Sequence, residues 1–451
     1  MEYCFDEQIK GFRTDLVLPL VWTQTMKAVF SNRIQIEGSP TLLQEMEEEL
    51  TYTLPPRIPS DPPMVIKTIR PLRAGLVSIP MGRIDLVPEE HEVVDKRIKM
   101  PVDFPDFKFT LRESQKWCYN QVDDSSIINA WVSWGKTITA LAIAKKLGQR
   151  TLIVTHTTNL RNQWEKEVIK AFGRPAGRIG SGMFQIGDFI SIGNIQTLYR
   201  RIPEIKQHFG TVVLDEMHHV SSPTFTRIID ELPARYKIGL TGTLERKDGR
   251  HVVFRDYFGH NVLKPPKENY MTPKIDVIKS DVRFLDGSYT PWAERVNHLV
   301  NTEEYVHRIS LIAAKYAAEG HKVLVVSDRV AFLKVCHRLV GNNSVCITGE
   351  MDFAEREKTM KLIGRSKNIL FGTQAIFSEG ISLDDLSCLV LATPVNNEPL
   401  LTQLIGRIIR QKEGKLQPTV VDIHLKGKTA TRQANARMGY YIKQDYKVNV
   451  L

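Results

Sequence analysis

The stretch Ala130–Thr137 reads A-x-x-x-x-G-K-T, and no other feature constrains the fold of this chain as much. It follows a short apolar run and precedes a helical pattern over Ile138–Leu147. In such a loop, backbone N–H groups wrap phosphate oxygens, the lysine reaches the β- and γ-phosphates, and the next hydroxyl ligates Mg²⁺. Gly135, Lys136 and Thr137 occupy these positions. The pattern therefore predicts a strand, a phosphate-binding loop and a helix.

Two residues of this loop depart from the usual pattern. Ser133 and Trp134 stand where phosphate loops usually carry Gly or Pro. A bulky side chain there must point away from the phosphates if the loop is to adopt a turn with positive φ. We therefore expect the indole to lie outside the phosphate site, and we expect Trp134→Gly to be tolerated for nucleotide hydrolysis.

Length and composition bound the class of protein. A chain of 451 residues exceeds one ordinary core, which predicts two or three domains. The net charge of +10 favours a polyanionic partner such as nucleic acid. The five cysteines form no C-x-x-C pair, so we expect neither zinc nor disulfides and a reducing compartment. No apolar run approaches the roughly 18 residues of a membrane span, and the N-terminus lacks a signal-peptide pattern, so a soluble intracellular protein is expected.

Residues 1–105 differ in pattern from the rest of the chain. Leu43–Leu50 is acidic and helical, and the proline-rich stretch Leu54–Met64 is expected to run extended. No catalytic constellation is present. The segment reads as a small α+β accessory domain, and both a structural or interface role and a nucleic-acid-binding role remain open.

Two series of short apolar runs alternate with helical patterns after this segment, which is typical of parallel α/β sheets. We place one domain at residues 106–268 and a second at 269–451, joined near Lys264–Lys267. The first series has predicted strands at Thr151–Val154, Phe189–Ile192, Thr211–Leu214 and Ile238–Leu240, with helices at Leu160–Phe172 and Thr224–Leu232. The second has predicted strands at Lys322–Val326, Ser344–Ile347, Asn368–Phe371, Ser387–Leu391 and Thr419–Ile423.

A nucleotide site needs carboxylates near its phosphate loop to bind Mg²⁺ and to activate water, and two adjacent residues of this chain are candidates. Asp215 and Glu216 follow the apolar run Val212–Leu214, and open α/β sheets place ligand groups at the carboxyl ends of such strands. We predict that Asp215 binds Mg²⁺ and that Glu216 orients and deprotonates the attacking water.

A third group of candidate site residues, one glutamine and two arginines, lies near the end of the chain. Residues 403–410 fit Q-x-x-G-R-x-x-R, and spacings of three and four residues predict that Gln403, Arg407 and Arg410 share a helix face. Arginines from a second domain that reach the γ-phosphate stabilise charge in the transition state. The pattern predicts a site between two domains that closes on the nucleotide.

These motifs, in this order over about residues 107–425, resemble those of superfamily 2 helicases of the DExH type. The segments Arg178–Gly182, Asp215–His219 and Leu240–Gly249 look most like the UvsW-like, XPB- and RecG-related group, which includes phage branch-migration DNA helicases. The resemblance implies two tandem RecA-like parallel-sheet domains behind the small N-terminal domain, with ATP and Mg²⁺ as cofactors.

The resemblance also implies roles for further residues. It assigns adenine contact to Gln115, assisted by Arg112, nucleotide binding to Gly380, and Mg²⁺ binding to Thr137 with Asp215. It assigns nucleic-acid contacts to Thr155, Gln196, Thr197, Thr348 and Thr373, and coupling of hydrolysis to domain movement to Thr241 and Thr243. Besides Ser133 and Trp134, two further positions depart from the family pattern: Leu244 replaces a Pro, and Ser382 replaces an Asp, which keeps a hydrogen bond and loses a charge.

The predicted function is therefore an ATP-dependent DNA helicase or translocase that unwinds or branch-migrates forked or branched DNA in replication, recombination or repair. We expect it to act as a monomer in the cytoplasm, the host cytoplasm if the protein is viral, without a membrane. An RNA helicase and a nucleotide-controlled clamp without productive unwinding remain alternatives. For the basic and aromatic segment Arg432–Tyr446, a closing helix that packs and one that stacks on DNA remain equally open.

Overall fold

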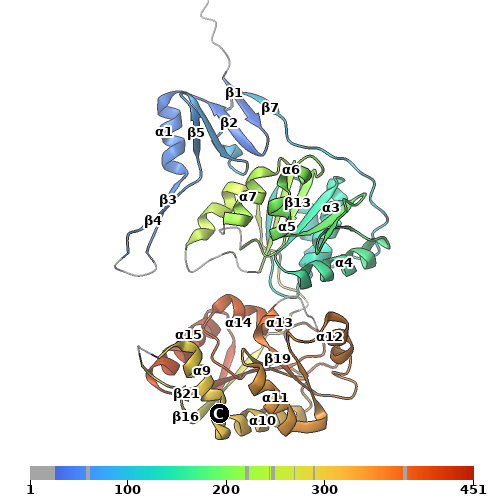
Figure 1. Ribbon diagram of the computed structural model, residues 1–451, viewed down its shortest axis with the longest axis vertical. Coiled ribbons are helices and arrows are strands. Elements are labelled where there is room, and N and C mark those ends of the chain that lie inside the picture. Colours follow the sequence, from blue (N-terminus) through green and yellow to red (C-terminus); the bar gives the residue numbers. More distant parts are fainter. Residues whose placement is uncertain are drawn as a thin grey trace, which may run out of the picture.

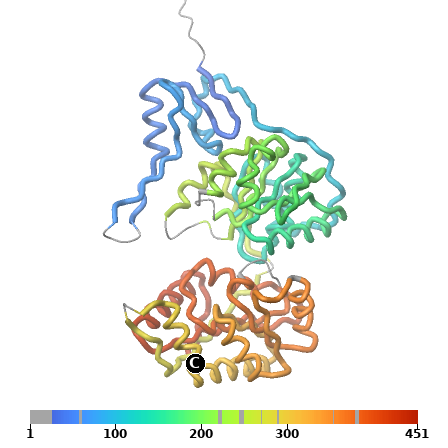
Figure 2. The backbone as a smooth tube through the Cα atoms, in the orientation of Figure 1, coloured from blue at the N-terminus to red at the C-terminus, as the bar shows by residue number. Residues whose placement is uncertain are grey.

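The computed structural model describes residues 26–56, 61–218, 223–242, 244, 249–268, 270–287, 290–378 and 383–451. Besides a two-stranded hairpin, three larger sheets follow one another along the described chain, and we call the parts that hold them the N-terminal, central and C-terminal domains (Figures 1 and 2). The prediction of two parallel-sheet domains behind a small N-terminal α+β domain is confirmed.

The N-terminal domain pairs one helix with a mostly antiparallel sheet. Its helix α1 spans Pro40–Glu49, where the Ser39 side chain caps the first turn by accepting a hydrogen bond from Leu42 N. Its sheet strands are β1 Lys27–Phe30, β2 Arg33–Glu37, β5 Arg70–Arg73, β6 Leu76–Pro80 and β7 Glu92–Asp95, in the order β5-β6-β2-β1-β7. The proline-rich stretch joins β3 (Thr51–Leu54) to β4 (Met64–Lys67), which form an antiparallel hairpin of their own.

The central domain contains a sheet that is parallel except at one edge. Its strands are β8 Ser126–Asn129, β9 Thr151–Thr155, β10 Gly177–Gly180, β11 Met183–Phe184, β12 Ile190–Asn194, β13 Thr211–Leu214, β14 Tyr236–Thr241 and β15 Val262–Leu263. They lie in the order β11-β10-β12-β9-β13-β14-β8-β15. The helices are α2 Glu113–Gln121, α3 Lys136–Leu147, α4 Thr158–Phe172, α5 Ile195–Arg200, α6 Ile202–Ile205, α7 Pro223–Glu231 and α8 Phe254–Phe258.

The C-terminal domain contains a second, wholly parallel sheet of described strands. They are β16 Lys274–Arg283, β17 Val323–Ser327, β18 Ser344–Ile347, β19 Ile369–Thr373, β20 Cys388–Leu391, β21 Thr419–Lys426 and β22 Lys447–Val450. Their order is β18-β19-β17-β20-β21-β16-β22. The helices are α9 Trp292–Val300, α10 Glu303–Ala318, α11 Val330–Val340, α12 Phe353–Met360, α13 Gln374–Ser378, α14 Glu398–Ile405 and α15 Lys428–Lys443.

Strand register brings the predicted motifs to one edge of the central sheet. At the end of β14, Thr241 pairs with Asn129 of β8, immediately before the phosphate loop. At the end of β13, Leu214 pairs with Gly239 of β14 and, on the other side, with Val154 of β9. Because parallel strands all end at the same edge, the loops after β8, β9, β13 and β14 lie together.

The predicted helix face of Gln403, Arg407 and Arg410 is wrong. Helix α14 ends at Ile405, and Gly406 caps it with its N–H 2.9 Å from the carbonyl of Thr402. Arg407 lies in the following turn, and Arg410 forms a bridge with Tyr270. The spacing of three and four residues is compatible with a helix and also with a tight turn. In the structure the helix ends between Gln403 and the two arginines.

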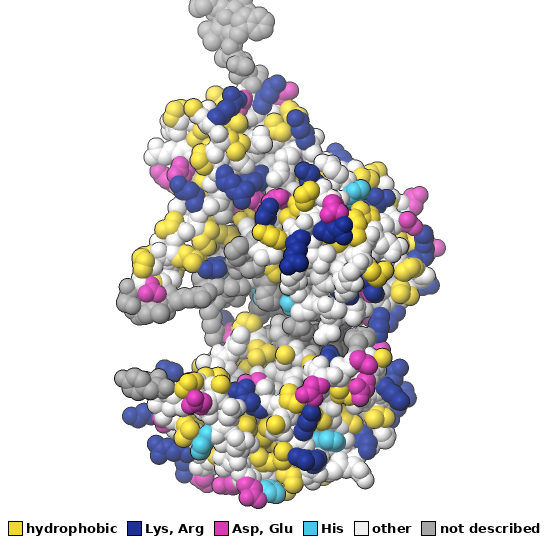
Figure 3. All heavy atoms as spheres, in the orientation of Figure 1, with side chains coloured by type: hydrophobic (Ala, Val, Ile, Leu, Met, Phe, Trp, Pro, Cys, Tyr) yellow, Lys and Arg dark blue, Asp and Glu magenta, His cyan; other side chains and the backbone are white. Residues whose placement is uncertain are grey.

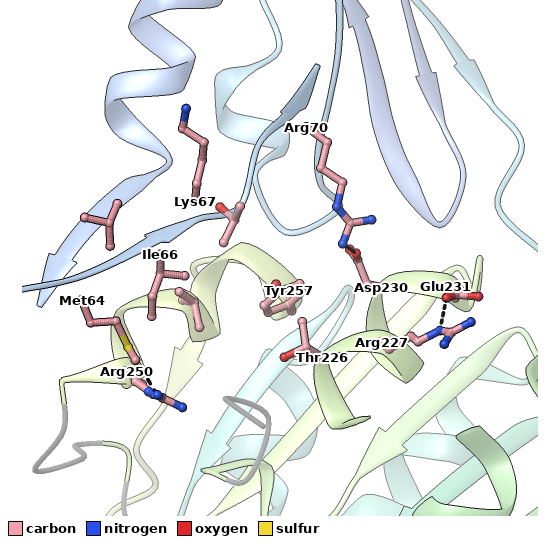
Figure 4. A pocket seen from close by; sticks show the side chains of 13 residues that line it. Met64, Ile66, Lys67, Arg70, Thr226, Arg227, Asp230, Glu231, Arg250 and Tyr257 are labelled. Atoms are coloured by element: carbon pink, nitrogen blue, oxygen red, sulfur yellow. Dashed lines mark hydrogen bonds and ion pairs between the residues drawn. The ribbon is translucent and has the colours of Figure 1, made fainter. Parts of the chain in front are cut away.

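Buried ion pairs fix the N-terminal domain to the central domain. Arg33 of β2 and Asp230 of α7 are both almost fully buried and paired, and Arg70 pairs with the same carboxylate (Figure 4). Gly82 donates a backbone hydrogen bond to Asp256 of α8 at 2.8 Å. A cavity of about 620 Å³ lies beside these contacts, between β4 and α7. The N-terminal domain is thus held by α7, which follows Asp215 and Glu216 in the chain, and by α8, which follows β14.

Candidate nucleotide and nucleic-acid site

The phosphate loop has the backbone of an anion site. Ser133 has φ +70° and Gly135 has φ +100°, so two residues of the loop lie in the left-handed region. Helix α3 begins at Lys136, and no side chain caps its first turn. The free N–H groups of a helix N-terminus, with the positive end of its dipole, favour a bound phosphate.

Trp134 points away from this loop into the core of the central domain. Its side chain is fully buried among the apolar residues of β8, α3 and α4, and its indole N–H donates to the Ser114 hydroxyl at 2.8 Å. The bulky side chain therefore lies outside the phosphate site, as expected. The expected tolerance of Trp134→Gly does not agree with this burial, because removing an indole leaves a large cavity.

Arg112 and Gln115 lie against the same loop. The Gln115 amide donates to the Trp134 carbonyl at 3.2 Å, and the Arg112 guanidinium donates to that carbonyl as well. A Cβ at Gly135 would lie 2.5 Å from Gln115 Nε2, so the loop needs glycine there for space as well as for its φ. The structure thus brings both predicted adenine contacts to the loop.

Lys136 lies between the loop and the two carboxylates. Its ammonium donates to the carbonyls of Ala130 at 3.0 Å and Trp131 at 3.3 Å. Burial lowers the pKa of Lys136, and the charges of Glu216 and Asp215 oppose that shift. Thr137 follows at the first turn of α3 and is partly buried.

Asp215 is buried at the end of β13. The indole N–H of Trp164, on α4, donates to Asp215 Oδ2 at 2.7 Å. Burial, together with the neighbouring charge of Glu216, raises the pKa of Asp215 to about 6. Glu216 has φ +50°, a conformation that costs energy for a non-glycine residue and is typical of functional sites.

The C-terminal domain reaches this cluster across the domain boundary. Ser133 Oγ donates to the Gly406 carbonyl at 2.8 Å, and Arg410 donates to the Ser133 carbonyl at 3.3 Å. Burial lowers the pKa of Arg407 to about 10, and the charge of Glu216 opposes the shift. Lys136, Glu216 and Arg407, predicted from three distant motifs, therefore lie in one electrostatic cluster.

A cleft of about 480 Å³ separates the carboxyl edges of the two sheets beside this cluster. The central domain lines it with residues after β9 and β13, among them Glu216. The C-terminal domain lines it with Asp328 after β17, Gln374 after β19, and Gln403 of α14. Gln403 is thus placed on the cleft, on the side opposite Glu216.

The predicted nucleic-acid contacts differ in exposure. Gln196 is exposed, and Thr197 and Thr373 are partly exposed. Thr155 is fully buried and donates to the Gly193 carbonyl at 3.3 Å, and Thr348 is also buried. The structure leaves the side chains of Thr155 and Thr348 without access to a nucleic-acid strand.

The predicted coupling residues are only partly described. Thr241 is buried at the end of β14, and its carbonyl accepts a hydrogen bond from Ala130 N of the phosphate loop at 3.0 Å. Thr243, Gly380, Ser382 and His219 lie outside the described residues.

Three contacts at the site were not predicted from the sequence. Trp164 holds Asp215, Ser114 holds the indole of Trp134, and Glu268 accepts a hydrogen bond from Ser114 N at 2.8 Å. Trp164 lies in the predicted helix Leu160–Phe172, but nothing in the sequence around it indicates a bond to a carboxylate. These partners depend on how α2 and α4 pack on the sheet.

The fold and the site define a class of protein. Two parallel-sheet domains face each other across a cleft, with a phosphate loop and paired carboxylates on one and arginines on the other. That arrangement is typical of two-domain nucleotide-driven motors.

Comparisons with known proteins identify the family. Residues 108–246 match the family described as type III restriction enzyme, res subunit, and residues 301–412 match the helicase conserved C-terminal domain. The probable helicase D10 of Escherichia phage T5 is 40% identical over 430 residues, covering 94% of this chain and 95% of that protein. The chain belongs to the superfamily 2 helicases, resembles the UvsW-like phage helicases, and is an ATP-dependent nucleic-acid helicase.

More distant relatives agree with this family. The ATP-dependent DNA helicase uvsW of Enterobacteria phage T4 is 23% identical over 346 residues, covering 71% of this chain and 69% of that protein. The solved structure of a Dbp5 variant from S. cerevisiae, bound to RNA and ADP BeF3, has a TM-score of 0.53 at 14% identity. The matched region covers 75% of this chain and 89% of the Dbp5 chain, which supports the assignment of the fold. Within the described part of the chain, no helix is long and apolar enough to cross a membrane.

Proposed function

We propose that this protein is a DNA helicase or translocase that acts as a monomer on forked or branched DNA in replication, recombination or repair. The observation that carries the motor mechanism is the contact of Ser133 with Gly406, which joins the phosphate loop to the arginine turn across the domain boundary. The preference for DNA rests on relatives, since phage T4 uvsW is named a DNA helicase.

The residues at the site fit ATP and Mg²⁺. The uncapped start of α3 suits phosphate oxygens, and Lys136 supplies a cation beside them. Thr137 and Asp215 provide hydroxyl and carboxylate oxygens, the ligand type that Mg²⁺ prefers. When bound, ATP would supply the free energy for movement, and its Mg²⁺ would offset part of the negative charge of the phosphates.

Each remaining site residue that the structure describes has a role that its position supports. Arg112 and Gln115, against the loop, contact the adenine. Glu216 takes the proton of the attacking water. Gln403 contacts the nucleotide from the cleft, and Arg407 and Arg410 stabilise the developing phosphate charge. Gly380, outside the described residues, keeps its predicted nucleotide contact.

Coupling between hydrolysis and movement runs through backbone contacts. Thr241 holds the phosphate loop through its carbonyl, and we assign to Thr241 and Thr243 the transmission of nucleotide state. Gln196, Thr197 and Thr373 then contact the nucleic-acid backbone at the carboxyl edges of the two sheets. Because such contacts are to phosphates, binding should weaken with salt and tolerate changes of sequence.

ATPase stimulation tests the substrate. We expect forked DNA to stimulate ATP hydrolysis by the purified protein more than linear duplex, single-stranded DNA or RNA at equal nucleotide concentration. The measurement is the steady-state ATPase rate against the concentration of each nucleic acid. Equal stimulation by all four would contradict a preference for branched substrates.

An RNA helicase is the second candidate. One relative, 24% identical over 330 residues, is named a putative ATP-dependent RNA helicase. The same panel separates the two candidates, because an RNA helicase should respond most strongly to RNA. Stimulation by RNA above that by every DNA would replace the proposed substrate.

A further inference from the structure

Helix α15 carries basic and aromatic residues on different surfaces. Its aromatic side chains, Tyr440 and Tyr441, are buried against the C-terminal sheet. Its first turns instead expose Lys428 and Arg432 to a shallow cavity of about 700 Å³. Packing therefore accounts for the aromatic residues, whereas it leaves the basic ones unexplained.

Two more cations line this cavity from the ends of the neighbouring strands β16 and β21. Arg283 and Lys426 are register partners and are 76% and 65% exposed. We call Arg283, Lys426, Lys428 and Arg432 the α15 basic surface. Figure 3 shows Lys and Arg side chains on the flank of the C-terminal domain where Figure 1 places α15 and β21.

The arrangement of these cations is unfavourable for folding. Arg283 and Lys426 are register partners on the parallel strands β16 and β21, and two like charges that lie close together repel. Like charges four residues apart on a helix also repel, which applies to Lys428 and Arg432. Positions that break such a local rule are expected at functional or strained sites.

The nearby carboxylates only partly offset this charge. Asp281 pairs with Lys426 at 2.7 Å. Asp286 is 4.0 Å from Arg283, but its oxygens also accept hydrogen bonds from Lys428 N and Thr429 N, both at 2.9 Å. Among the described residues, no acidic side chain pairs with Lys428 or Arg432. The surface therefore keeps an excess of positive charge.

The position of this surface connects it with the cleft. Asp422 of β21 pairs with Leu391, the last residue of β20. Strand β21 then continues beyond the end of β20 as far as Lys426. The surface thus projects beyond the same carboxyl edge of the sheet that carries Thr373 and Asp328. A polyanion that lies along this edge would meet it.

We propose that the α15 basic surface binds the phosphate backbone of the nucleic acid outside the helicase motifs, in a manner independent of sequence. Thr431 and Asn435, which also line the cavity, add neutral hydrogen-bonding groups of the kind that contact phosphates. This inference rests on the proposed function, because it assigns a second contact region for the same partner.

The test compares two double variants of the full-length protein by their salt-dependent binding to forked DNA. Lys428→Gln/Arg432→Gln removes two cations of the surface. Lys315→Gln/Arg338→Gln removes two exposed cations from α10 and α11, which do not line the cavity, and is the matched control. The affinity is measured between about 50 and 200 mM salt, where each phosphate contact contributes about 0.9 to the slope of log K against log salt.

We expect the surface variant to bind more weakly at low salt, with a slope shallower by about 2 than that of the wild type. The control variant should keep the wild-type slope, and both should keep the ATPase rate measured without DNA. A wild-type slope in the surface variant would overturn the inference and leave the proposed function intact. Failure of the wild-type protein to bind either DNA or RNA would overturn both.

Discussion

Arg407→Ala is expected to lower the rate of ATP hydrolysis by about 10³–10⁵-fold, the range found for arginines that reach a transferred phosphate. Arg407 is buried beside Glu216 and Lys136, where its charge is poorly screened and therefore acts strongly on a nearby phosphate. The measurement is kcat for ATP in the presence of saturating nucleic acid. The loss should fall on kcat more than on KM, because the contact strengthens in the transition state.

Two further variants separate this role from a structural one. Arg407 Nε also donates to the Phe377 carbonyl at 2.7 Å, so removal of the side chain disturbs a turn as well as the site. Arg407→Lys keeps a charge but loses the planar, forked set of donors, and we expect it to recover only part of the rate. Arg338→Ala, on the exposed face of α11, should leave kcat unchanged. A folded Arg407→Ala protein with near wild-type kcat would remove the arginine from the mechanism.

Trp134→Gly is expected to destabilise the central domain by about 3–5 kcal/mol, the cost of truncating a buried tryptophan. The indole is fully buried, and its N–H bond to Ser114 ties the phosphate loop to α2. Substitution would also leave the Ser114 hydroxyl without this donor. The measurement is the denaturant midpoint of the transition that reports on the central domain.

Comparison with other aromatic substitutions controls this prediction. Trp134→Phe keeps most of the volume and loses one hydrogen bond, so its destabilisation should be smaller. Trp117, on the same helix as Ser114, is 39% exposed, and Trp117→Ala should shift the midpoint much less. If Trp134→Gly and Trp117→Ala had equal effects, the burial of Trp134 would not determine the stability of this loop.

Local patterns were enough to predict the sheets and the centre of the site. Strands such as β13 and β17 are short apolar runs, and the phosphate loop and the Asp215–Glu216 pair are contiguous in sequence. Parallel topology then brings their ends together without further information. Strand β16 was not predicted, because its sequence KIDVIKSDVR mixes charged and apolar residues along a strand whose far end projects past the sheet.

Features that depend on packing could not be predicted in this way. The burial of Trp134 and its bond to Ser114 follow from how α2 lies on the sheet. Arg407 leaves the helix face because α14 ends at Ile405. A Cβ at Gly406 would lie 2.4 Å from Val132 Cβ of the phosphate loop. The glycine thus allows the two domains to approach, a requirement that spacing alone does not reveal.

Strand displacement by Lys136→Ala tests the central claim most directly. Wild-type protein with ATP should separate the strands of a forked DNA, whereas Lys136→Ala should hydrolyse no ATP and displace no strand while still binding that DNA. Loss of displacement with retained binding is the result that a nucleotide-driven motor predicts, because the lysine of a phosphate loop reaches the β- and γ-phosphates and is not one of the proposed nucleic-acid contacts. Equal strand displacement by the two proteins would contradict the motor. Failure of the wild-type protein to displace a strand while it still hydrolyses ATP would also contradict the motor, and it would favour a nucleotide-controlled clamp.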